Sequence, residues 1–119
     1  MTLYVAIFSC LNPLLTAINI SYFHFLGSCD ISPKSGIVLE DKFKMTCSGW
    51  IDQHEPLSYN FHSLRDGVTK TFCNGKFTEC STVLPIGNKS EDYNSMIFVK
   101  IADSLGGSYT ANITVMVRR

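Results

Sequence analysis

The stretch CDISPKSGIVLEDKFKMTCSGWIDQHEPLSYNF, from Cys29 to Phe61, decides the fold of this chain. It holds two segments in which apolar and polar residues alternate, and a polar loop separates them. Such alternation is typical of strands that bury one face. Cys29 precedes the first alternating segment and Cys47 lies within it, so a cysteine is placed to tie the start of the stretch to its first long strand. The stretch predicts the seed of an antiparallel β-sandwich.

The rest of the chain supplies the remaining strands. The segment Ser95–Ala102 is apolar on both faces, which is typical of a central strand. The segment Tyr109–Val117 alternates cleanly, and no helical period of useful length occurs after residue 28. We therefore expect an all-β domain over residues 29–119, with strands at 29–32, 42–50, 57–64, 95–102 and 109–117. The side chains expected to be mostly buried are Phe43, Cys47, Trp50, Leu57, Tyr59, Ile97, Val99, Tyr109, Ile113 and Val115.

Five cysteines are many for 119 residues, and they predict disulfides in an oxidising compartment. Four of them lie in the predicted domain and allow three connectivities, whereas Cys10 lies outside it. Closeness in the sequence favours the pairs Cys29–Cys47 and Cys73–Cys80. Neither pair has the spacing of zinc ligands, and the three histidines are scattered, so no metal site is predicted.

The region 68–84 contains two signals that exclude each other. Asn74-Gly75 is a strong signal for a two-residue hairpin. In that hairpin Cys73 would pair with Lys76, which would leave Cys80 too far along its strand for a disulfide. We favour the disulfide, with residues 74–79 forming a wider loop that it closes.

Residues 1–28 contain no Lys, Arg, Asp or Glu and are mostly apolar. A signal peptide, a membrane anchor and a fragment artefact are three interpretations of this leader. A signal peptide would have a positive flank and a clean cleavage site, and neither is visible. Asn12, Pro13, Asn19 and His24 interrupt the apolar run that an anchor needs. These alternatives stay open.

Composition and motifs argue against catalysis and nucleic-acid binding. Ten basic residues balance ten acidic ones, so no basic surface for phosphate backbones is expected. No nucleophile elbow or Cys/His signature occurs, and no cofactor is predicted. Asp52, Glu55 and Asp103 could be calcium ligands, but their spacing is not that of a calcium loop. For Asp103, before Leu105-Gly106-Gly107, we expect a turn held by its side chain.

Three sequons with the pattern N-x-[ST] occur at Asn19, Asn88 and Asn112. Asn88 falls in a predicted loop, and Asn112 falls on the outward face of the last strand. We predict glycosylation at Asn88 and Asn112. Asn19 could be glycosylated only if the leader is retained and lies in the lumen of the secretory pathway.

Several spaced motifs resemble the receptor-for-egg-jelly (REJ) region of polycystin-1-like proteins. They are C-x-I-x-P-x-x-G from Cys29, F-x-x-x-C-x-x-W-x-D from Phe43, P-L-x-Y-x-F from Pro56, and the run Ile97–Gly106. The resemblance covers about residues 29–117. It implies a sandwich related to fibronectin type III and immunoglobulin-like domains, within the long ectodomain of a membrane protein.

Two departures separate the chain from neighbouring families. Trp50-Ile51-Asp52 is not the W-D-F-G-D-G motif of the PKD repeat. An immunoglobulin domain would bridge its second and sixth strands, but the segment 95–102 has no cysteine to meet Cys47.

The resemblance favours a non-enzymatic extracellular module of a polycystin-like receptor or channel, serving adhesion, spacing or ligand contact. The alternative is a stand-alone immunoglobulin-like binding protein, secreted or tethered to the membrane through residues 1–28. The expected partners are neighbouring ectodomain modules or an extracellular protein or glycan ligand. We expect contacts at the two ends of the sandwich, where loops 51–55, 88–93 and 104–107 emerge.

Overall fold

The structure is a computed structural model that describes residues 27–51 and 54–119. Most of the predicted leader, with Cys10 and Asn19, and the loop residue Asp52 therefore lie outside the described residues. Within the described part, the chain forms the strands β1 (Ser28–Ser32), β2 (Ser35–Ile37), β3 (Phe43–Ser48), β4 (Ser58–Arg65), β5 (Val68–Gly75), β6 (Glu79–Thr82), β7 (Asn94–Ala102) and β8 (Ser108–Arg118), and the short 3-10 helix η2 (Lys89–Glu91).

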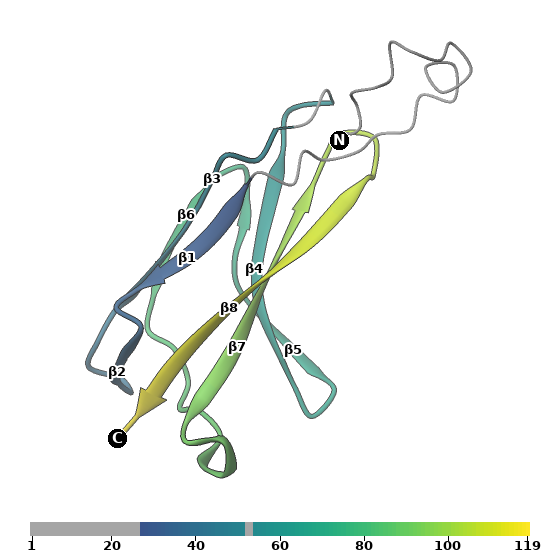
Figure 1. The fold of residues 1–119 in the computed structure, drawn as a ribbon. Coiled ribbons are helices and arrows are strands. Elements are labelled where there is room, and N and C mark those ends of the chain that lie inside the picture. The colour runs from purple at the N-terminus through teal and green to yellow at the C-terminus, as the bar shows by residue number, and fades with distance from the viewer. Residues whose placement is uncertain (1–26, 52–53) are drawn as a thin grey trace.

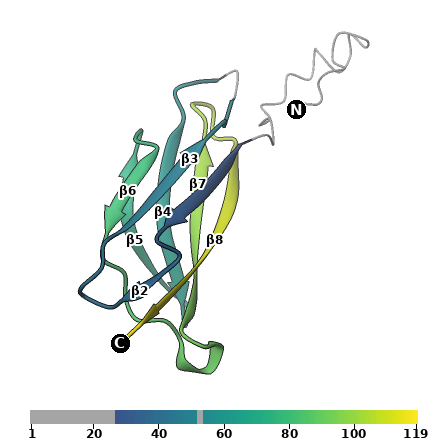
Figure 2. The same cartoon turned by 60° about the vertical axis from the view of Figure 1, so that its left-hand side comes forward.

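The strands form two sheets that face each other as the layers of a sandwich (Figure 1). One sheet has the order β1-β3-β6, and the other has the order β2-β8-β7-β4-β5. The turned view in Figure 2 shows β1, β3 and β6 in front of the longer sheet. The predicted all-β sandwich is confirmed. The central place predicted for the segment 95–102 is also confirmed, because β7 lies between β8 and β4.

The strand β2 was not predicted, and β5 and β6 lie in the region 68–84, for which no strand bounds were predicted. After Pro33 the chain leaves the first sheet, and β2 pairs in parallel with the end of β8. The amide of Met116 donates to the Lys34 carbonyl at 3.0 Å, and the amide of Val38 donates to the Arg118 carbonyl at 2.7 Å. The five-stranded sheet is therefore mixed rather than purely antiparallel. Three residues are too few to show a period of two, so the sequence carried no signal for β2.

The core lies between the two sheets and consists of the inward faces of their strands. Phe43, Met45 and Cys47 of β3 alternate with exposed or half-buried neighbours, as predicted. The expectation for Tyr109 was wrong, because its side chain is 40 % exposed. The buried apolar residues are Ile31, Phe43, Met45, Cys47, Trp50, Leu57, Tyr59, Phe61, Cys80, Leu84, Ile97, Val99, Ile101, Ile113, Val115 and Val117.

Both predicted disulfides are present, and they connect different parts of the fold. Cys29–Cys47 joins neighbouring residues of β1 and β3, which are directly paired in the ladder. Cys73–Cys80 joins β5, at the edge of the five-stranded sheet, to β6, at the edge of the other sheet. Their Cα atoms are 5.9 Å apart. The chain crosses between sheets after Gly75, so no tight hairpin forms at Asn74-Gly75. The connecting loop is narrower than the predicted 74–79, because β5 runs to Gly75 and β6 begins at Glu79.

Candidate functional site

The two ends of the sandwich are the first candidate surfaces. Figure 1 shows β1 beginning at the end where the β7–β8 hairpin projects, while β8 finishes at the opposite end, beside the loop that contains η2. The start of β1 and the finish of β8 thus lie at opposite ends of the described sandwich.

At the first end, polar contacts hold two loops together. The amide and the hydroxyl of Ser104 both donate to the His54 carbonyl, at 2.9 Å and 3.0 Å. The buried Asp103 Oδ1 accepts from the amides of Leu105 at 3.0 Å and Gly107 at 2.7 Å. The predicted role of Asp103 in holding this turn is confirmed. Its Oδ1 is therefore occupied by backbone donors, whereas Glu55 is exposed.

At the other end, the loop 88–93 carries the first sequon. Asn88 caps η2, and its Oδ1 accepts from the amide of Ser90 at 3.0 Å and from the Ser90 hydroxyl at 2.8 Å. Asp92 and Tyr93 have positive φ and end the helix, after which the amide of Val117 donates to the Tyr93 carbonyl at 3.0 Å. The cap uses the side-chain oxygen of Asn88, whereas a glycan would attach to its nitrogen. The exposed side chain can therefore carry both.

The second sequon lies on the outer face of the five-stranded sheet. Asn112 and Thr114 of β8 are exposed, and the intervening Ile113 is buried in the core. Asn112 pairs with Phe98 of β7, which in turn pairs with His62 of β4. The prediction that Asn112 faces outward agrees with this register. Sequence analysis missed that an aromatic side chain lies directly opposite it.

The ring of Phe98 packs on this face against the imidazole of His62. The rings of His62 and Phe98 stack with centroids 5.8 Å apart and an interplanar angle of 27°. His62 Nδ1 also lies 2.7 Å from Asn60 Oδ1, which orients the imidazole. The outward alternation of β4 and β7 was the signal that could have revealed this pair, because both residues belong to the faces opposite the predicted core.

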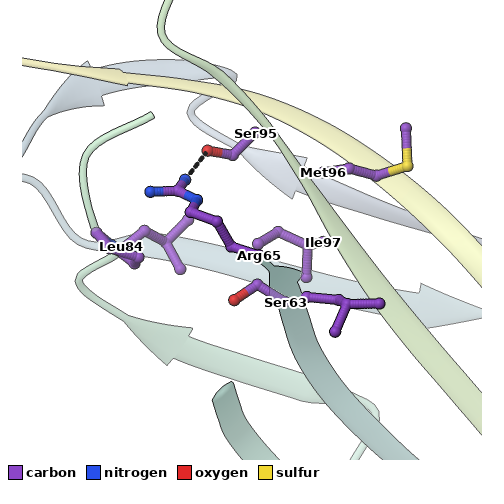
Figure 3. Close-up of a pocket in the computed structure, with 8 residues that line it drawn as sticks. Ser63, Arg65, Leu84, Ser95, Met96 and Ile97 are labelled. Atoms are coloured by element: carbon purple, nitrogen blue, oxygen red, sulfur yellow. Dashed lines mark hydrogen bonds between the residues drawn. The ribbon is translucent and has the colours of Figure 1, made fainter. Parts of the chain in front are cut away.

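A small pocket opens between β4, β7 and the segment after β6 (Figure 3). Arg65 reaches across it and donates to the Ile86 carbonyl at 2.9 Å and to Ser95 Oγ at 3.1 Å. Its cavity volume of about 20 Å³ gives room for roughly one water molecule. Arg65 ties the β4–β5 hairpin to the loop before η2, and the pocket is too small for an organic substrate.

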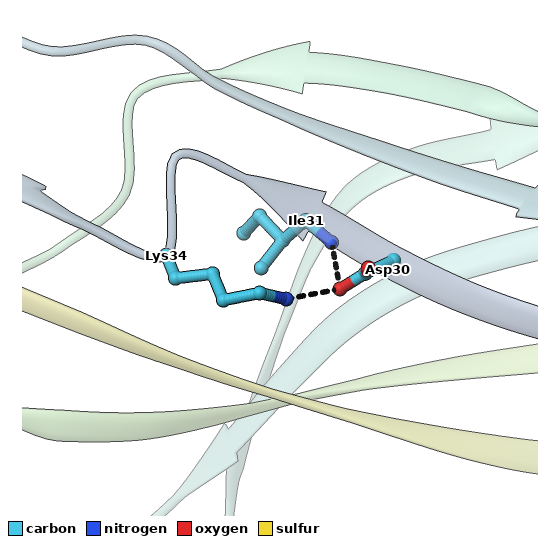
Figure 4. Close-up of polar contacts among 3 residues, drawn as sticks. All are labelled: Asp30, Ile31 and Lys34. Carbon is cyan, nitrogen blue, oxygen red and sulfur yellow. Dashed lines mark hydrogen bonds and ion pairs between the residues drawn. The ribbon is translucent and has the colours of Figure 1, made fainter.

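Polar contacts at the bend between β1 and β2 involve three residues (Figure 4). Asp30 Oδ1 accepts from Lys34 Nζ at 2.7 Å and from the amide of Ile31 at 2.8 Å. The hydrogen bond from Lys34, then that from Ile31, lowers the pKa of Asp30 below its ordinary value. Both charged side chains are largely exposed, so we assign this pair to shaping the bend rather than to binding.

Within residues 27–51 and 54–119, no three His, Cys, Asp or Glu side chains gather as a metal site would require. The same part of the chain holds no helix of the length and apolar character needed to cross a bilayer.

Comparison with known proteins identifies the family. The family model of the REJ domain matches residues 17–119. The chain belongs to the REJ domain family. The match begins at residue 17, inside the segment that we assigned to the leader.

Two curated relatives support this assignment. The chain is 30 % identical over 94 residues to the human polycystin family receptor for egg jelly, and the match covers 68 % of the chain. It is 32 % identical over 94 residues to the mouse protein of the same name, again over 68 % of the chain. The matched region is 4 % of the length of each relative. The resemblance to the REJ region that the sequence motifs indicated is thereby confirmed.

Proposed function

We propose that this REJ domain is a non-enzymatic module in the ectodomain of a polycystin-like membrane receptor, where it spaces its neighbours and contacts them at its two ends. The observation that carries the proposal is the position of the first and last strands, which begin and finish at opposite ends of the sandwich (Figure 1). Family membership supports a module in a longer chain over a stand-alone binding protein.

An extracellular location is the second part of the proposal. Two disulfides within such a small domain are characteristic of oxidising compartments. Exposed sequons at Asn88 and Asn112 fit the same location, since both asparagines can take a glycan without disturbing the core. The neighbours that the module contacts are then other ectodomain segments or an extracellular protein or glycan.

Secretion tests the location. The full chain of residues 1–119, carried by an added secretory signal, is expressed in animal cells, and the secreted product is analysed before and after glycosidase treatment. We expect mass shifts at both Asn88 and Asn112 and linked peptides for both disulfides under non-reducing conditions. A folded secreted protein that lacks glycan at both asparagines contradicts the glycan assignment. A product that is soluble only as a reduced cytosolic form contradicts the location.

Cross-linking tests the contacts at the ends. Lys89 lies in the end loop and Lys100 on the outer sheet face, and both are exposed, which makes them a matched pair. In the cell-surface protein that carries this chain, lysine cross-linking should join Lys89 to residues outside the domain more often than Lys100. A reversed ratio would show that the sheet face, and not the end, meets the neighbours.

The third part of the proposal is that the module has no enzymatic activity. Neither the roughly one-water pocket beside Arg65 nor the open hollow lined by Phe77, Thr78, Glu79 and Ser81 contains a histidine or cysteine. Activity-based probes for serine and cysteine hydrolases should leave the folded, secreted protein unlabelled. Stoichiometric labelling of one residue would refute the proposal that the module has no enzymatic activity.

A further inference from the structure

The outer face of the five-stranded sheet carries an apolar strip that the core does not use. It consists of Met96 and Phe98 of β7 and Leu64 of β4, and we call it the outer strip. Met96 is 45 % exposed and Leu64 is 55 % exposed, while Phe98 is half-buried. Covering these side chains would remove apolar surface from water, which is favourable. The imidazole of His62 covers only part of the strip, through its stack on Phe98.

The sequon at Asn112 runs alongside this strip. In the β7–β8 ladder Asn112 is directly opposite Phe98, and Thr114 is directly opposite Met96. Residues that face each other across an antiparallel pair have Cβ atoms about 4.5–5.5 Å apart. The first sugar of an N-glycan is joined to the asparagine side-chain nitrogen, so it begins within reach of the side chain opposite.

We propose that the first N-acetylglucosamine on Asn112 packs against Phe98 and Met96 and covers the outer strip, so that this glycan stabilises the fold. The inference rests on the glycosylation proposed above. One face of a pyranose ring presents C–H groups, which are attracted to the negative face of an aromatic ring. The contact also removes apolar surface of Met96 and Phe98 from water, which is favourable in itself.

The sequon at Asn88 provides a contrast within the same chain. Its neighbours Lys89, Ser90 and Glu91 are all exposed and polar, and none offers an apolar surface to a sugar. The residue paired directly with Asn88 is the polar Asn94, so no apolar side chain stands opposite this sequon as Phe98 does opposite Asn112. The two glycans should differ in their effect on stability although both are attached to the same domain.

Two variants remove one glycan each with little change to the protein. Thr114→Val removes the acceptor hydroxyl of the Asn112 sequon and keeps a β-branched side chain at the exposed position. Lys89→Pro blocks the Asn88 sequon, because proline is excluded from its middle position. Asn88 is already extended, with φ −78° and ψ 121°, and residue 89 is the first of η2, where proline is tolerated.

Thermal unfolding of the secreted full chain then compares the glycoforms. We expect Thr114→Val to lower the melting temperature by roughly 4 °C or more, and Lys89→Pro to leave it within about 1 °C. Wild-type protein trimmed to a single N-acetylglucosamine at each site should keep its full melting temperature. Completely deglycosylated wild type should match fully deglycosylated Thr114→Val, which separates the effect of the glycan from that of the valine.

The contact itself is tested in two ways. In a Phe98→Ala background, loss of the Asn112 glycan should change the melting temperature by less than half of the wild-type difference. Should Phe98→Ala fail to fold, NMR of the trimmed wild type gives the same information, because sugar protons above an aromatic ring shift upfield. We expect such shifts, with nuclear Overhauser contacts to Phe98, for the sugar on Asn112 and not for the sugar on Asn88.

The outcomes separate the two proposals. Absence of glycan on Asn112 in the secreted protein overturns both the glycosylation at this site and its packing role. Full occupancy of Asn112 with equal melting temperatures and unshifted sugar protons overturns the packing role alone.

Discussion

Single residues hold the loops at the two ends of this domain, and each does so through a specific backbone contact. At one end the carboxylate of Asp103 accepts two amide hydrogens of the turn that follows it. At the other end Gly87 is buried between β8 and the loop 88–93, with its amide donating to the Val117 carbonyl at 2.8 Å. These positions tolerate few side chains because the neighbouring atoms are backbone and cannot rotate away.

The first prediction concerns Gly87. A Cβ atom built on this residue would overlap the backbone carbonyl of Tyr93. We expect Gly87→Ala to destabilise the fold by about 1–3 kcal/mol, the usual cost of overpacking, and to loosen the loop 88–93. Chemical denaturation measures the loss. Gly67→Ala is the control, because Gly67 has open space around it and a φ of 77° that imposes only backbone strain. Equal losses for both variants would show that the overlap is relieved without cost.

The second prediction concerns pH. Burial, and then the charge of Glu55, raises the pKa of Tyr59 above its ordinary value. As the pH rises through about 10, the unfolded chain loses the tyrosine proton before the folded one does, so the free energy of unfolding falls. Below that pH, Tyr59 makes its full contribution to the free energy of unfolding. We expect the urea midpoint to decrease from pH 9 to pH 11, and Tyr59→Phe to show a smaller decrease over the same range. An identical decrease in both proteins would assign the effect to other groups.

Among the strands, β7 and β8 determine the core and the outer face together. The two strands pair along nine positions of β7, from Asn94 to Ala102. Successive side chains along each strand alternate between the core and the outer face of the sheet. Ile97, Val99 and Ile101 are buried, and the residues between them face outward. The apolar run 95–102 therefore fills the core with one face and builds the outer strip with the other.

The third prediction tests the register of β8. Ile113 is 4 % exposed and lies in the core. Ile113→Ala should lower the free energy of unfolding by about 2–5 kcal/mol, because it leaves a cavity between the sheets. Thr110→Ala, on the exposed face of the same strand, should change it by about 0.5 kcal/mol or less. If a denaturant titration gave a loss of about 0.5 kcal/mol or less for both variants, Ile113 would lie on the outer face of the sheet, and the register of β8 would be wrong.

At the scale of the whole molecule, the disulfide Cys73–Cys80 cross-links the edge strands of the two sheets. β5 pairs only with β4, and β6 pairs only with β3, so no ladder joins the two edges that the bridge connects. Cys29–Cys47, by contrast, reinforces a pairing that the β1–β3 ladder already makes. The two bridges should therefore differ in which part of the structure depends on them.

The fourth prediction follows from that difference. Replacing Cys73 and Cys80 together by alanine should cost about 2–3 kcal/mol in the chain-entropy estimate for a short loop. Hydrogen exchange should then speed up most in β5 and β6, where the two sheet edges separate. Replacing Cys29 and Cys47 together should cost about 3 kcal/mol, with faster exchange in β1 instead. The same exchange pattern in both double variants would contradict the separate roles.

The sequence by itself determined the all-β class, the inward positions of β3, the inward positions 113, 115 and 117 of β8 and the turn at Asp103, and it favoured the two cysteine pairs. These features depend on local order, because a period of two places side chains on alternate faces whatever the rest of the chain does. The conflict between Asn74-Gly75 and the nearby bridge could be resolved because a ladder fixes distances between its residues.

Only the tertiary structure decided how far each sheet extends over the other. The strands β1, β3 and β6 have five, six and four residues, whereas β7 and β8 have nine and eleven. Tyr109 has an inward position but lies near the overhanging end of β8, where the ring of Trp50 packs against it with the ring centroids 5.2 Å apart. The parallel pairing of β2 and the facing of Asn112 and Phe98 are likewise contacts between distant segments. Alternation along one strand contains no information on which strand lies beside it or where the opposite sheet stops.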